Sequence, residues 1–262
     1  MTPEQYQKFT DQLVANLAHD ARVVGIISAG SMAAQGRLPD RWSDHDFFVI
    51  VESGQQEDFR QNLQWVPDYD HMIFSFRETE HGVKAIFDYG HLIEFAVFDV
   101  EETNLVSLNA YRVLLDRVDL GSRLAAIAHR TAINTANGND THYVGQFLSH
   151  LMIGAARYKR GEKLSGHRFI KDFALYELLW LLSKYLPAED RTKLDNLDAS
   201  RRFEKVFPEM GATISDLLLL DPIETAVGML TTADTLLRPV MPNFPAEAFA
   251  TIQQYLQTIQ AE

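Results

Sequence analysis

The sequence predicts an α+β fold in two domains: a mixed β-sheet with flanking helices, followed by an all-α helical bundle. Strand-like and helix-like patterns alternate up to about Leu120, and only helical periodicity follows. The polar stretch 134–140 separates the two patterns. We therefore expect a first domain over residues 1–136 and a helical domain over residues 137–262.

The first domain is expected to open with a helix. Thr2-Pro3-Glu4-Gln5 matches a capping box with proline at the first helical position. The apolar stripe that follows consists of Tyr6, Phe9, Leu13 and Leu17. Short apolar runs then predict strands over residues 22–28, 47–51, 71–77, 83–87, 92–98 and 111–115. A short helix is expected over 59–66, and Asp88-Tyr89-Gly90 predicts a hairpin turn.

The second domain shows helical periodicity throughout. Helices are expected over residues 144–158, 166–186, 221–237 and 245–259. Gly161 is placed to end the first of them, and Ser165 to cap the second. The last helix carries the apolar stripe Phe249, Ile252, Leu256 and Ile259.

Composition excludes several classes of protein. The 262 residues include no cysteine, which rules out a disulfide scaffold, thiolate metal sites and cysteine nucleophiles. The net charge of -12 makes nucleic acid an unfavourable partner, and the first domain holds -9 of it. No apolar run reaches the ~18 residues of a membrane-spanning helix. We therefore expect a cytoplasmic protein with no membrane contact.

The sharpest motif joins a Gly-Ser turn to a pair of aspartates. Gly30-Ser31 follows a predicted strand, and after a gap of twelve residues Asp44-His45-Asp46 leads into another. Free backbone N–H groups and a hydroxyl at such a turn suit phosphate oxygens. In an extended segment, Asp44 and Asp46 point to one face with Cα atoms roughly 6.5 to 7 Å apart, and His45 points away. Such a carboxylate pair suits Mg²⁺ together with substrate phosphates.

A third carboxylate is expected near this pair. Glu94 lies within the apolar strand 92–98, where an unpaired charge is expensive to bury. Asp88 and Asp99 are weaker candidates, because turns and strand ends accommodate acids at little cost.

Together these elements resemble the signature of the DNA polymerase β-like nucleotidyltransferase superfamily. The size and layout resemble its lincosamide and aminoglycoside antibiotic nucleotidyltransferases. The resemblance implies Mg²⁺-dependent transfer of a nucleoside monophosphate from a nucleoside triphosphate (NTP) to a hydroxyl, with release of pyrophosphate. It makes Asp44 and Asp46 metal ligands, and Glu94 the general base or an additional metal carboxylate. Gly30, Ser31 and Ser43 become nucleotide contacts. It further implies an antibiotic-like small molecule as acceptor and is compatible with a homodimer.

A basic run distinguishes the second domain. Residues 157–171 hold six cationic side chains against Glu162, a local net charge of +5. Arg168 and Lys171 are expected in the first turn or so of a helix, where cations oppose the helix dipole. A triphosphate held between the domains would reverse that penalty. The alternative is that both side chains lie solvated along the helix.

Each candidate also has a structural alternative. Asp44 and Asp46 could form a solvated strand start with Ser43 closing a turn, and Gly30-Ser31 could be a tight turn alone. Glu94 could be an ordinary acid on a half-exposed sheet. Two rival functions follow: an enzyme of the same fold that modifies an RNA end or a protein, and a catalytically silent nucleotide-binding module.

Overall fold

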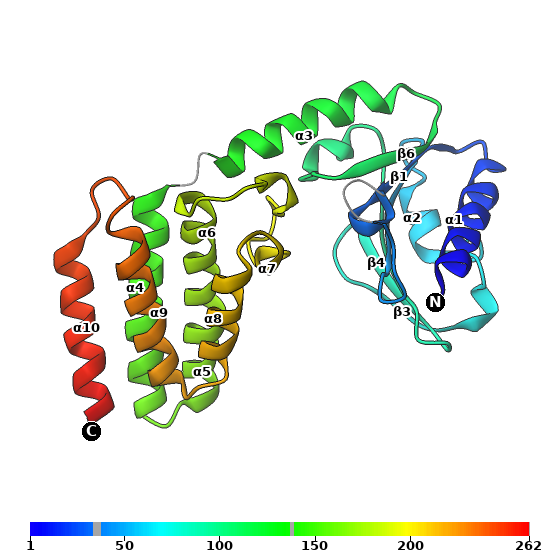
Figure 1. Cartoon of the computed structure of the whole chain (residues 1–262). Helices are drawn as coiled ribbons and strands as arrows, with labels where there is room; N and C mark the ends of the chain where they lie inside the picture. Colours follow the sequence, from blue (N-terminus) through cyan, green and yellow to red (C-terminus); the bar gives the residue numbers. More distant parts are fainter. Residues whose placement is uncertain (34–37, 137–138, 262) are drawn as a thin grey trace. The chain divides into compact units, whose positions relative to one another are not determined.

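The computed structural model describes residues 1–33, 38–136 and 139–261. The chain divides into two compact units, Met1–Asn134 and Thr135–Glu262 (Figure 1). The first has a hydrophobic cluster on each face of its sheet, and the second has one cluster among its helices. The first is a sheet with helices and the second is helical, so the predicted α+β class is confirmed. The predicted boundary falls in the same region, where residues 137–138 lie outside the described part of the chain.

A six-stranded mixed sheet forms the centre of the first unit. Its strands are β1 (Val23–Ala29), β2 (His45–Val51), β3 (Met72–Arg77), β4 (Gly82–Phe87), β5 (Leu92–Phe98) and β6 (Tyr111–Asp116). They lie in the order β3-β4-β5-β2-β1-β6, with the β2–β5 pair parallel and the other pairs antiparallel. The predicted turn at Asp88-Tyr89-Gly90 joins β4 to β5, with Gly90 at a φ of 76°.

Helices cover the two faces of this sheet. Helices α1 (Pro3–Ala18) and α2 (Gln56–Gln61) pack on one face, as Figure 1 shows. Helix α3 (Leu120–Ala136) packs on the other. Strands β2 and β5 direct buried residues towards α1, and their opposite face carries half-buried residues together with the buried Ile50 and Phe98. That opposite face carries the candidate acids described below.

Local sequence signals explain the helix ends. The predicted capping box forms at α1, where Gln5 N donates to Thr2 Oγ1 and Thr2 N donates to Gln5 Oε1. The helix predicted over 59–66 is wrong in extent, because α2 ends at Gln61. Leu63 and Val66 are nevertheless buried. The periodicity therefore identified buried residues correctly, although no continuous helix joins them. Short 3₁₀ turns also belong to this unit: η1 (Gly30–Ala33), η2 (Tyr69–His71) and η3 (Glu102–Leu105).

The second unit is a set of helices around one core. They are α4 (Asp140–Lys159), α5 (Lys163–Arg168), α6 (Leu175–Tyr185), α7 (Phe203–Val206), α8 (Pro208–Leu218), α9 (Pro222–Leu237) and α10 (Ala246–Ala261). A π-helical turn (Phe169–Ala174) joins α5 to α6, and a 3₁₀ turn η5 (Arg191–Lys193) precedes α7. Gly161 follows the end of α4 in the left-handed conformation, with a φ of 88°.

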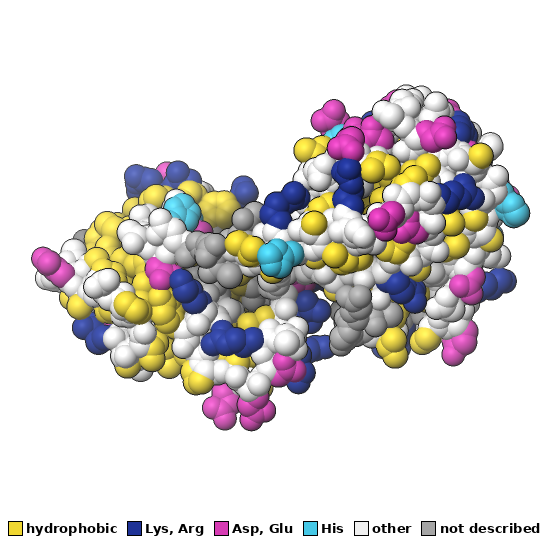
Figure 2. Space-filling model, turned by 90° about the horizontal axis from the view of Figure 1, so that it is seen from above, with side chains coloured by type: hydrophobic (Ala, Val, Ile, Leu, Met, Phe, Trp, Pro, Cys, Tyr) yellow, Lys and Arg dark blue, Asp and Glu magenta, His cyan; other side chains and the backbone are white. Residues whose placement is uncertain are grey.

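The surface carries charged side chains of both signs. Figure 2 shows acidic and basic side chains interspersed on the face that it presents. In the described part of the chain, none of the helices combines the length and the hydropathy needed to traverse a bilayer.

Candidate functional site

Asp46 and Glu94 are the centre of the candidate site. They face each other in register on the neighbouring parallel strands β2 and β5, and both are half-buried. Adjacent strands lie about 4.8 Å apart, so the two side chains on one face are direct neighbours. The sheet topology thus brings together two acids that are 48 positions apart in the sequence.

The Gly-Ser turn lies directly against Asp46. Strand β1 pairs with β2, and Gly30 opens the turn η1 at the end of β1. Gly30 has a φ of 53°, and a Cβ placed there would lie 3.2 Å from Asp46 Oδ2. The Ser31 hydroxyl is buried beside the Tyr6 phenol, and no hydrogen bond of normal geometry engages its oxygen within the described residues.

Gly30→Ala is expected to impair this turn. An L-residue in the left-handed region costs about 1 to 2 kcal/mol, and the added Cβ would crowd the Asp46 carboxylate. We expect the free energy of unfolding in urea to fall by about that amount. We expect the free energy of nucleotide binding to weaken by more than that amount. Gly54→Ala is the matched control, because Gly54 also has a positive φ but has open space around it. Equal effects of both variants on nucleotide affinity would contradict a binding role for the Gly30 turn.

Asp44 lies immediately before β2 and is exposed. Its backbone carbonyl accepts a hydrogen bond of 2.8 Å from the Tyr6 hydroxyl, which ties the start of β2 to helix α1. Burial raises the pKa of Tyr6, and the negative charges of Asp44 and Asp46 raise it further. Both carboxylates therefore lie near one buried phenol. Tyr6 did not stand out in the sequence, where it reads as one member of the apolar stripe of α1.

His45 points to the opposite face of the sheet from Asp46 and lies in the core. Its Nδ1 is 2.8 Å from Nε2 of His91, its Nε2 is 3.0 Å from Thr10 Oγ1, and its ring stacks on Tyr6 at 3.7 Å. Burial lowers the pKa of His45 to about 3 and that of His91 to about 4. This buried pair supports the segment that carries Asp44 and Asp46.

Acidification should therefore destabilise the fold through this histidine pair. Unfolded histidine titrates at about pH 6.5, well above the folded values of about 3 and 4. The unfolded state therefore binds protons first, and stability should fall as the pH drops below about 6.5. We expect a lower Tm at about pH 5 than at about pH 7. His91→Gln, which cannot titrate, should show a smaller drop, and an equal drop would contradict the assignment.

Lys84 lies beside Glu94 of the acidic pair Asp46 and Glu94. Its Nζ lies 3.1 Å from Glu94 Oε2 and 2.5 Å from Glu78 Oε1. In strand register, Lys84 of β4 is opposite Glu94 of β5, which in turn is opposite Asp46 of β2. The hydrogen bonds to Glu78 and Glu94 raise the pKa of Lys84. The alternating pattern of β4 alone does not distinguish Lys84 from any solvated lysine.

Ser43, a predicted nucleotide contact, has hydrogen-bond partners within the protein. Ser43 is buried, and its hydroxyl accepts from the Asp40 N–H at 3.0 Å and donates to Asp40 Oδ1 at 3.3 Å. Ser43 thus closes the turn that precedes Asp44, as the structural alternative predicts. Its role as a nucleotide contact stays a prediction.

Arg168 and Lys171 belong to the second unit. The expectation that both lie in a first helical turn after Ser165 is wrong, because α5 begins at Lys163 and continues through the π-helical turn. The Lys171 ammonium donates to the backbone carbonyls of Leu218 and Leu220 at 2.8 and 2.5 Å, at the end of α8. A cation at a helix C-terminus is favourable without any ligand. Arg168 is exposed, with its guanidinium 4.9 Å from the centre of the Phe173 ring.

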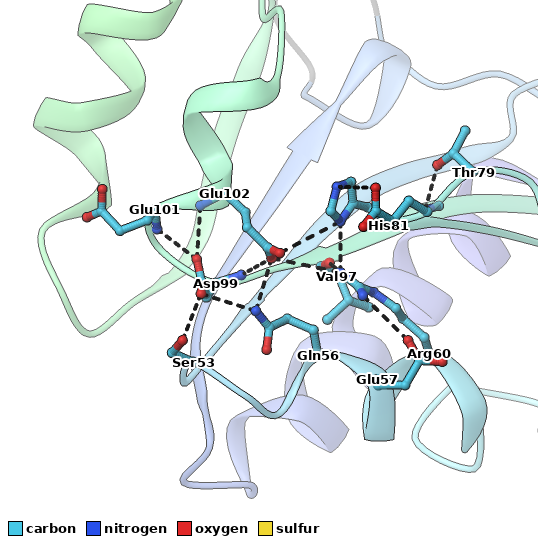
Figure 3. Close-up of polar contacts among 12 residues, drawn as sticks. Ser53, Gln56, Glu57, Arg60, Thr79, His81, Val97, Asp99, Glu101 and Glu102 are labelled. Atoms are coloured by element: carbon cyan, nitrogen blue, oxygen red, sulfur yellow. Dashed lines mark hydrogen bonds and ion pairs between the residues drawn. The ribbon is translucent and has the colours of Figure 1, made fainter.

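The two weaker acid candidates have structural partners. Asp99 accepts hydrogen bonds from Ser53, Gln56 and the backbone N–H groups of Glu101 and Glu102 (Figure 3). The Glu102 N–H is the largest cause of the lowered pKa of Asp99. Asp88 pairs with His71 at 3.0 Å on the surface. Both acids stabilise loops, which leaves Glu94 as the mid-strand acid beside Asp46.

The residues present fit a hard divalent cation that arrives with phosphate. Within residues 1–33, 38–136 and 139–261, no three His, Asp or Glu side chains form a ready-made metal-binding group. Mg²⁺, however, takes one or two protein carboxylates and completes its shell with water and substrate phosphates. Asp46 and Glu94 in register, with the Gly30 turn against Asp46 Oδ2, supply that donor set.

Solved structures include matches to this chain over most of its length. The crystal structure of an aminoglycoside 6-adenyltransferase from Bacillus subtilis matches over 98% of each chain, at 12% sequence identity and a TM-score of 0.37. No protein-family model and no curated protein matches the chain. The functional assignment therefore depends on the residues of the site.

Proposed function

We propose that this protein is a Mg²⁺-dependent nucleotidyltransferase that moves a nucleoside monophosphate from an NTP to a hydroxyl of a small molecule. The observation that carries the proposal is the Asp46–Glu94 pair, in register on neighbouring strands with the Gly30 turn against it. Two like charges side by side on one sheet face repel each other and attract cations. Lys84 already contacts Glu94 there, and a metal ion that arrives with phosphate would offset the charge of both acids.

In such a reaction, different residues of the chain would bind the metal, bind the phosphates and accept the proton. Asp44 and Asp46 would hold the metal, with the Gly30-Ser31 turn offering N–H groups and a hydroxyl to phosphate oxygens. Bound Mg²⁺ would neutralise the phosphates and stabilise the charge that develops in transfer. Glu94 would join Asp44 and Asp46 as a further carboxylate at the metal and would accept the proton of the attacking hydroxyl at its other oxygen. The Glu94 side chain is 43% exposed, so an acceptor can reach it.

The test is a product screen. Each of the four NTPs is incubated with Mg²⁺ and with aminoglycosides, lincosamides and simple polyols, and products are detected by mass. A covalent adduct of the acceptor with a nucleoside monophosphate, together with equimolar pyrophosphate, is the expected result. Label from a radioactive NTP on RNA or protein would instead support an enzyme that modifies macromolecules. Nucleotide binding without turnover on any acceptor would support a silent binding module.

A further inference from the structure

We infer that Lys84 is a built-in counter-ion of the candidate metal site, and that a divalent cation must compete with its ammonium group for the acidic pair Asp46 and Glu94. This inference deepens the proposed function and rests on it. It assigns a role to a residue that the proposed reaction does not otherwise use.

Strand register carries the first step. Lys84, Glu94 and Asp46 lie in one row across β4, β5 and β2, one residue from each strand. Neighbours in such a row are about 4.8 Å apart. The Lys84 ammonium already contacts Glu94 Oε2 at 3.1 Å. A positive charge in this position lowers the repulsion between the two carboxylates, and it equally repels a second cation that approaches them.

Glu78 also binds Lys84, and we call this second ion pair the tether. Glu78 holds the same ammonium at 2.5 Å, so the lysine is bound by a second carboxylate besides Glu94. Glu78 follows the edge strand β3, and its backbone N–H donates to the Gly82 carbonyl, so it is fixed to the start of β4. Lys84 is therefore shared between two carboxylates, and Glu78 would retain it if Glu94 bound a metal ion.

The three side chains are exposed enough for a metal ion to replace the Lys84 ammonium at Glu94. The side chains of Lys84, Glu78 and Glu94 are 24%, 35% and 43% exposed. Ion pairs at this level of exposure contribute little to stability, since water replaces the lost contact. Lys84 can therefore leave Glu94 at a small cost. A dication would offer the carboxylates two positive charges where the ammonium offers one.

The experiment measures Mn²⁺ binding to the nucleotide-free chain, by the electron paramagnetic resonance signal of free Mn²⁺. Lys84→Gln should bind Mn²⁺ about threefold more tightly than the wild-type chain, and Lys84→Arg should stay within about twofold of it, on the scale of exposed ion pairs. Lys8→Gln is the matched control: it removes the same charge from α1, which covers the opposite face of the sheet. It should leave Mn²⁺ affinity unchanged.

A double-mutant cycle tests the tether. Glu78→Gln should weaken Mn²⁺ binding about twofold when Lys84 is present, because the released ammonium then pairs with Glu94 alone. In the Lys84→Gln background the same change should have no such effect. An equal loss in both backgrounds would show that Glu78 acts only through its own charge and would overturn the tether.

The outcomes separate the inference from the proposed function. If Asp46→Asn weakens Mn²⁺ binding at least about tenfold but Lys84→Gln leaves it unchanged or weakens it, the metal site survives and the role of Lys84 is overturned. If the wild-type chain binds no Mn²⁺ and Asp46→Asn changes nothing, the role of Lys84 is overturned, and the product screen decides the proposed function independently. Thermal melting of each variant checks that it folds.

Discussion

Asp46→Asn should abolish NTP-dependent pyrophosphate release with any acceptor that the wild-type protein uses. We expect a loss of at least about a hundredfold in kcat/KM, about 2.7 kcal/mol of transition-state stabilisation. The physical reason is that an amide cannot supply the negative charge that holds a hard dication. Asp46 also contacts the Gly30 turn, so the same change alters the proposed phosphate subsite.

The Asn variant preserves shape, which makes the result interpretable. Its Tm should stay close to that of the wild-type protein, because only a charge is removed at a half-buried position. Asp70→Asn is the control, since Asp70 is an exposed acid on η2. It makes the same charge change and should retain full turnover. Normal turnover of Asp46→Asn would remove the metal assignment and the function built on it.

Phe47→Ala should destabilise the protein by about 3 to 5 kcal/mol in urea or guanidinium unfolding. Phe47 is fully buried, stacks on Phe95 at 5.3 Å and meets the Trp65 ring edge at 6.3 Å. Removing the ring loses its burial and leaves a cavity between β2 and the helices that cover it. Globular domains are stable by only about 5 to 15 kcal/mol, so this loss is a large fraction of the total.

The matched control is Phe74→Ala on β3. The Phe74 side chain is 56% exposed, and the same truncation should cost no more than about 0.5 kcal/mol. Because Phe47 follows Asp46 directly, Phe47→Ala should also lower Mn²⁺ affinity, by loosening the strand that carries the acid. A loss of less than about 1 kcal/mol for Phe47→Ala would contradict the packing described for this face of the sheet.

Local signals in the sequence were enough to predict most elements. The capping box at Thr2, the strand that holds Glu94 and the turn at Gly90 depend on residues close together in the chain, and all three are confirmed. The same logic failed where tertiary contacts compete with local preference. The periodicity after Phe59 predicted buried residues correctly but a helix wrongly, because α2 ends at Gln61. Ser165 was predicted to cap a helix, but that helix begins earlier, at Lys163.

The fold class and the identity of the acids follow from the amino-acid sequence alone, because hydrophobic periodicity and an Asp-x-Asp beside a strand are local patterns. Which of these acids meet depends on the folded chain. The parallel β2–β5 pairing sets Glu94 opposite Asp46, the hairpin brings Lys84 to the other side of Glu94, and α8 takes Lys171 as the partner of its final carbonyls. The Asp46–Glu94 and Lys171–α8 contacts join residues far apart in the chain, and sequence spacing carries no information about their register. Register is set by which faces the core buries, and that is a property of the whole fold.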